Sequence, residues 1–373
     1  MGILELVSPR PRELNSVTAN KLEIVMPFLV DAVDRKVHEL EDRVRSVIQS
    51  YYTTLHPSVY WKFKREAQNY IQSTNAGLTY ALKEIKFKEV YPLYGQVDIS
   101  ESSVTRNLSV SNDLRNQLKH LINILNELSK TDGQLPAKEL LFDLKAFARD
   151  LATNFRADTE QFIKHYVEDN VHPILLAAVN TGKSLKAKID DYFKQIDELT
   201  GEFHINRRNY DKTLSLINQK LASILDRRQA EIREFLPHYY ERFKTDGVEH
   251  NMYIGATIAP NKEFSIRDLH RLRLWQLRVI AEMEVEQYDL KNVLPYQLGV
   301  TSLILVFGAP IAIRFRMDEK HFDVDGAYNI RYEVIKKRID KARINGSNER
   351  ITVQGKITII YAKAEEEQEY RVI

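Results

Sequence analysis

The stretch from Lys21 to Tyr51 reads KLEIVMPFLVDAVDRKVHELEDRVRSVIQSY and indicates one long amphipathic helix. Its apolar residues recur in steps of three and four, which is the spacing of a single face of an α-helix. Ser16 or Thr18 is suited to begin the helix, and Pro27 is expected to kink it. The apolar stripe consists of Leu22, Met26, Leu29, Val33, Val37, Leu40, Val44, Val47 and Tyr51.

Two interpretations of this stripe stay open. The steps follow a heptad repeat with one slip between Met26 and Val37, and such a repeat favours a two-stranded coiled coil with a second copy of the chain. Alternatively, the helix packs against the rest of its own chain, and the same stripe is buried internally. Charged residues at Val37 and Val44 distinguish the two, because a dimer would become a folded monomer, whereas an internal helix would lose stability.

The composition excludes several classes of protein. The 373 residues are 43% hydrophobic and 28% charged, which allows two or three globular domains. The 54 basic and 52 acidic residues give a net charge of only +2, so the whole chain makes no electrostatic case for nucleic acid. Cysteine is absent, which excludes disulfides, thiolate metal sites and a cysteine nucleophile. No signal peptide and no apolar run of membrane-spanning length is present, so we expect a cytoplasmic protein without a membrane partner.

The rest of the chain changes character near Asp246 and Gly247. Helical periodicity dominates 55–245, and we predict a helical bundle there, interrupted by a strand-like loop at 90–99. From 246 to 373, β-branched runs bounded by Gly and Pro indicate a small α+β domain. The fold class is therefore mainly α with a C-terminal α+β part, in which a helical bundle is followed by a small mixed or antiparallel sheet with two helices. In this last part we predict strands at 252–258, 298–307, 309–317 and 351–362, and helices at 265–290 and 328–343.

Residues 1–54 resemble the end of a GAF domain, a small sensory domain of bacterial signalling proteins. The resemblance rests on the strand-like GILELVS at 2–8, a turn with proline, and a helix that contains KLE at 21–23. The remainder resembles the tail of large bacterial GAF-containing sensory proteins, with 91–99, 316–320 and 322–329 as its markers. This resemblance implies signal transduction. It brings no ligand residues and no cofactor, because the sheet and pocket of a GAF domain are not part of this segment.

A group of cations is a candidate surface for an anionic or protein partner. The helix predicted at 328–343 is basic on its outer side, and alternating arginines make one face of the strand at 309–317 basic. The competing interpretation is a solvated helix face with no partner. The residues concerned are Arg314, Arg316, Lys336, Lys337, Arg338 and Lys341.

A pocket formed by loops is a second candidate site. Aromatic and acidic side chains meet in 91–99, although such a loop more often packs its rings against a helical bundle. The DVDG segment at 323–326 resembles part of a calcium loop, but the closing glutamate is missing, so its acids are better suited to cap the next helix. We therefore predict no metal site. The candidate pocket residues are Tyr91, Tyr94, Asp98, Asp323 and Asp325.

No pattern typical of catalysis is found. The segment 180–184 ends in Gly-Lys-Ser but lacks the earlier glycine of a phosphate-binding loop, and the ten histidines are scattered. We therefore expect no catalytic residue and a non-enzymatic module that relays a conformational change through its connector helix to other protein domains. The alternative is an enzyme or binding domain for a phosphorylated small molecule. It would use Asp323, Asp325, Arg314 and Arg316, and it requires a deep pocket where these residues converge.

Overall fold

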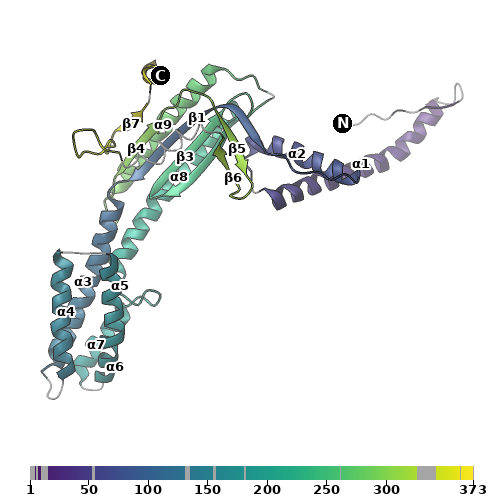
Figure 1. Cartoon of the computed structure of the whole chain (residues 1–373). Coiled ribbons are helices and arrows are strands. Elements are labelled where there is room, and N and C mark those ends of the chain that lie inside the picture. Colours follow the sequence, from purple (N-terminus) through teal and green to yellow (C-terminus); the bar gives the residue numbers. More distant parts are fainter. Residues whose placement is uncertain are drawn as a thin grey trace.

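The computed structural model describes residues 5, 7–9, 16–52, 55–130, 135–153, 157–179, 182–260, 262–325, 342–361 and 363–372. Its centre is a sheet covered by helices, and a helical bundle and one long helix extend from it in different directions (Figure 1). The long helix is α1, Ser16–Tyr51, and Pro27 lies inside it as predicted. The order of the remaining elements follows the chain from α2, Pro57–Asn75, to the short C-terminal helix α11, Ala364–Val372.

The sheet is mixed, and its strand order is β2-β3-β1-β4-β7, with β5 and β6 attached to one end of β1. All pairs are antiparallel except β4 with β7, which run parallel. This confirms the predicted fold class of a mainly helical chain with an α+β part. The strands are β1 (Lys86–Ile99), β2 (Tyr239–Thr245), β3 (Gly247–Ile254), β4 (Val300–Leu305), β5 (Ile311–Arg316), β6 (His321–Val324) and β7 (Ile357–Ile360).

The segment 90–99, predicted as a strand-like loop, is part of the central strand β1, so its assignment to a loop was wrong. Pro92 and Gly95 argue against a central strand in sequence. Pro92 is tolerated because the pairing with β4 starts only at Tyr94, so β1 has a single neighbour, β3, at position 92. A register shift between Phe87 and Val90 bends β1, which lets its first half pair with β5 and its second half with β3 and β4.

Helices cover both faces of the sheet. On one face lie α8, Ile205–Phe235, and α9, Ile266–Lys291, whose apolar side chains pack on alternate residues of β1 such as Val97 and Ile99. On the other face lie α2 and the last turns of α1, which pack around Tyr94 and the β5–β6 hairpin. The helix predicted at 265–290 is therefore confirmed as α9. The one predicted at 328–343 lies outside the described residues, apart from its last two positions.

The bundle has a separate hydrophobic core and projects from one end of the sheet (Figure 1). Two long helices, α3 and α8, connect it to the sheet, because α3 follows β1 directly and α8 precedes β2. Consequently 55–245 supplies not only the bundle but also β1 and β2. The other bundle helices are α4 (Leu135–Thr153), α5 (Ala157–Tyr166), the short π-helix Val167–Val171, α6 (His172–Ala178) and α7 (Lys183–Gln195), and α3 spans Ser102–Leu128.

Candidate interaction surface

The stripe of α1 meets two different environments. Val44 is 1% exposed, and Ile48 is also buried, because both belong to the core between α2 and the sheet. Towards the N-terminus the same stripe is open: Val33 is 57% exposed and Val37 is 47% exposed. The internal interpretation is therefore confirmed for Val44, and Val47 packs partly against the same core, whereas Tyr51 is 42% exposed. The stripe up to Leu40 has no covering element among the described residues, and the dimer stays a prediction. The exposed apolar residues here are Val25, Met26, Phe28, Leu29, Val30, Val33, Val37 and Leu40.

The C-terminal part of α1 is held firmly against its neighbours. The ring of Tyr52, just after the helix, contacts Phe63 of α2 and Phe315 of β5 edge to face, with centroids 4.8 and 5.7 Å apart. Arg43 donates a hydrogen bond of 2.9 Å to the side chain of Asn75, the last residue of α2. Beyond this point α1 extends away from the remainder of the molecule (Figure 1). These contacts fix the C-terminal part of α1 to α2 and β5.

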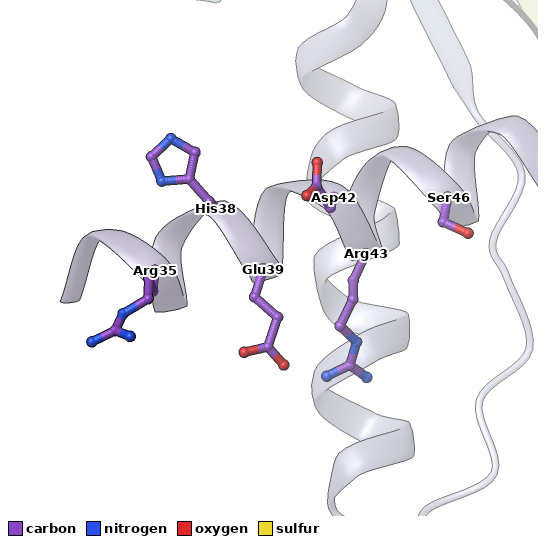
Figure 2. A pocket seen from close by; sticks show the side chains of 6 residues that line it. All are labelled: Arg35, His38, Glu39, Asp42, Arg43 and Ser46. Carbon is purple, nitrogen blue, oxygen red and sulfur yellow. The ribbon is translucent and has the colours of Figure 1, made fainter. Parts of the chain in front are cut away.

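A shallow hollow on α1 lies on the polar side of the helix. Figure 2 shows that all six lining side chains come from this one helix, so no second element closes over the hollow. Its charges are satisfied locally: Arg35 donates to the carbonyl of Asp31 at 3.3 Å, and Lys36 lowers the pKa of Glu39 through a hydrogen bond of 2.7 Å. The hollow therefore gives no reason to expect a small ligand. The lining residues are Arg35, His38, Glu39, Asp42, Arg43 and Ser46.

The arginines predicted to bind an anion are already paired with carboxylates. Arg314 and Arg316 extend from β5 on its outward side, and Arg314 lies opposite Asp323 of β6 in the hairpin. Arg314 is 3.7 Å from Asp325, and Arg316 is 2.7 Å from Asp318, whose pKa it lowers to about 2 by hydrogen bonding. The structure thus brings the predicted acids and arginines together in a surface ion-pair network. Because the carboxylates neutralise the arginines, this face of β5 is not basic.

The remaining residues of the predicted pocket do not meet one another. Tyr91 stacks on Phe264 beside α9, whereas Tyr94 is buried on the opposite face of the sheet, where its hydroxyl donates to Gln96 at 3.3 Å. Asp98 lies further along the same strand, opposite Gly247. Because successive residues of a strand point to opposite faces, Tyr91 lies on the face opposite Tyr94 and Asp98, so the five predicted residues do not line one cavity.

Three further predictions concern cations and phosphate. Lys336, Lys337, Arg338 and Lys341 lie outside the described residues. The Gly-Lys-Ser segment begins α7, and its Ser184 donates to Glu127 at 3.2 Å, which is a structural role. Within the described ranges, no three histidine, aspartate or glutamate side chains come together as metal ligands would.

Two half-buried glutamates were not identified from the sequence. Glu202 lies in a cavity of about 210 Å³ between the bundle and the start of α8, and burial raises its pKa to about 7. Glu284 of α9 lines an open groove beside β4 and β7, where burial raises its pKa and the hydroxyl of Ser302 donates to it. Neither residue belongs to a sequence motif, and the burial that raises the two pKa values arises only in the tertiary fold, so no signal in the sequence points to them.

A polar contact joins the two sides of the sheet layer. Gln229 of α8 lies between two histidines, with its amide nitrogen 3.2 Å from Nε2 of His56 and 3.4 Å from Nε2 of His238. His56 also caps the N-terminus of α2. This contact connects the α1–α2 pair to α8, which continues into the bundle.

Comparison with known proteins does not add to this description. No known protein family, no curated protein and no solved structure matches the chain. The resemblance to the end of a GAF domain stays a prediction. Among the helices that the structure describes, none combines the length and the apolar character needed to cross a membrane.

Proposed function

We propose that this chain is a non-enzymatic interaction module of a signalling protein, in which α1 binds a partner helix and relays its movement. The expected partner is a second copy of the chain, with other protein domains contacting the bundle or the sheet. The observation that carries the proposal is the change of environment along one stripe, from exposed at Val33 and Val37 to buried at Val44.

The path for a relay follows from contacts already described. A shift of α1 moves Val44 and Ile48, which pack in the same core as Tyr52 and Phe63. From α2 the displacement reaches α8 through the contact of His56 with Gln229. Because cores are packed to high density and deform little, such a path transmits movement of whole helices rather than dissipating it.

The test places charges on the open part of the stripe. The double variant Val33→Glu/Val37→Glu is expected to be folded and monomeric, since both positions are exposed in the single chain, whereas the wild type is dimeric by light scattering. His38→Glu/Ser46→Glu, which adds the same number of glutamates on the polar side of α1, is the matched control and should stay dimeric. A wild-type chain that is monomeric at high micromolar concentration contradicts the homodimer.

Val44→Glu separates the internal part of the stripe from the open part. Because Val44 is 1% exposed, a charge there is expected to destabilise the fold by several kcal/mol rather than change the assembly alone. Unfolding in urea, followed by circular dichroism, measures this. A Val44→Glu chain as stable as the wild type would show that α1 does not pack on the core.

The alternative, binding of a phosphorylated small molecule at Arg314 and Arg316, is the weaker proposal. A phosphate at these arginines would have to displace Asp325 and Asp318, which already neutralise them. We therefore place the function in the surface of α1.

A further inference from the structure

We infer that two copies of α1 pair in parallel and in register, through an eleven-residue repeat that continues into the core of each chain. This inference rests on the proposed function and specifies the geometry of the dimer.

The eleven-residue repeat becomes visible when the exposed Val25 and the buried Ile48, which lie beside the stripe, are counted as part of it. Steps of four, three and four residues return every eleven positions, and the supposed slip is the junction between two repeats. Only Lys36 is not apolar among the twelve stripe positions. They are Leu22, Val25, Met26 and Leu29, then Val33, Lys36, Val37 and Leu40, then Val44, Val47, Ile48 and Tyr51.

An eleven-residue repeat has about 3.67 residues per turn, close to the 3.6 of a straight α-helix. The stripe therefore stays on one side of α1 without the left-handed supercoil that a heptad requires. The third repeat already packs over three of its four positions, because Val44 and Ile48 are buried against α2 and the sheet and Val47 is partly buried there, whereas Tyr51 is 42% exposed. The first two repeats present the same pattern with no covering element among the described residues, which is the face that a second α1 would fill.

Charges beside the stripe favour the parallel orientation. At about 100° per residue, Asp34 and Glu41 lie on one side of the stripe, and Lys36 and Arg43 lie on the other. In a parallel pair each side of one helix meets the opposite side of its partner, so acids meet bases. In an antiparallel pair each side meets its own copy, so acids would face acids.

Asp34 and Lys36 are the relevant pair in the open part of the helix. Glu41 and Arg43 already contact Lys64 and Asn75 of α2. In the single chain Lys36 forms an exposed ion pair with Glu39, 2.7 Å away, which costs little to exchange for an aspartate of the second copy. The aliphatic part of Lys36 can then cover Val37 of that copy while the ammonium group reaches Asp34.

Disulfide cross-linking tests the orientation without interference, because the chain has no cysteine of its own. We would oxidise Met26→Cys and Leu40→Cys chains separately and as a mixture, and separate the products by non-reducing electrophoresis. A parallel pair in register predicts covalent dimers from each variant alone. Asp31→Cys, on the far side of the helix, is the control for random collision and should stay monomeric on the gel.

Other outcomes overturn the inference in distinguishable ways. Cross-links only in the mixture, with a dimer present by light scattering, would show an antiparallel pair centred near Val33 and leave the proposed function intact. Absence of any cross-link in a dimeric protein would exclude both arrangements, and the Val33→Glu/Val37→Glu variant would then show whether α1 is the interface at all. A monomeric wild type would remove the proposed function as well.

Charge reversal provides an independent measurement. At low salt, Lys36→Glu should weaken a parallel dimer roughly three- to tenfold, because each copy then places a glutamate beside Asp34 of the other. The effect should diminish at high salt. An unchanged or tighter dimer would refute the parallel arrangement.

Discussion

Gly95 in the central strand gives the sharpest test of the sheet, because its Cα faces the ring of His250 across the β1–β3 pair. A Cβ at position 95 would lie 2.4 Å from Cε1 of His250 and 2.9 Å from Nε2 of Gln276. Ordinary contacts need about 1 Å more, and His250 is fully buried, hydrogen-bonded to Gln276 at 3.0 Å. Gly95→Ala is therefore expected to destabilise the protein by about 2–3 kcal/mol, as overpacking of a rigid core does.

A double-mutant cycle isolates this contact. In a His250→Ala background the ring is gone, and the amide of Gln276 loses its hydrogen-bond partner there and can turn away from residue 95. Gly95→Ala should then cost less than about 0.5 kcal/mol, and the coupling energy should be about 2 kcal/mol. The chain has two tryptophans, and Trp61 and Trp275 both pack on helices beside the sheet, so fluorescence during urea unfolding reports this part. Equal costs of Gly95→Ala in both backgrounds would refute the proximity of residue 95 to the ring.

Three other predictions concern buried ionisable groups. Burial lowers the pKa of His238 and His250 to about 4, so the folded state binds fewer protons than the unfolded one. The free energy of unfolding should therefore fall as the pH drops below about 6.5, and urea midpoints measured from pH 8 to 5 test this. Glu202 gives the opposite pH dependence, because its pKa is raised to about 7 and stability is therefore lost as the pH rises from about 4.5 to 7. Glu202→Gln should stabilise the chain at pH 8 by about 1 kcal/mol, a value discounted for partial exposure, and should have little effect at pH 5. Arg273 of α9 is buried and ion-paired with Glu369 of α11, so Arg273→Ala should lower the free energy of unfolding in urea by about 3 kcal/mol. The double variant Arg273→Met/Glu369→Leu should recover most of this loss.

Local periodicity was sufficient to predict much of the helical structure. The three- and four-residue steps predicted α1, α9 and most bundle helices, because a helix buries one face whatever its neighbour is. The β-branched runs predicted β4 and β5 for the corresponding reason. Strands β2 and β6 were missed. β2 is largely solvent-exposed and its sequence shows no apolar alternation, and β6 has only four residues.

The candidate site was predicted only in outline. The sequence determined that α1 has an apolar face, but not which turns are covered by the chain itself, because periodicity identifies a face and not its neighbour. Arg314 and Arg316 show the same limit. Their spacing predicted that both lie on the outward side of β5, but which acids neutralise them is determined by the pairing with β6 and by nearby loops.

The tertiary structure alone decided the place of 91–99 and the ionisation of the buried acids and histidines. Pro92 and Gly95 disfavour a strand locally, yet this segment pairs with β3 and β4 in the centre of the sheet. Pro92 is tolerated because β4 does not pair at that position, and Gly95 is required because the ring of His250 occupies the space of a side chain. The raised pKa of Glu202 has a similar origin, because desolvation depends on contacts between residues far apart in the chain. Sequence patterns record which faces must be buried, whereas the partners that bury them are fixed only when the whole chain has packed.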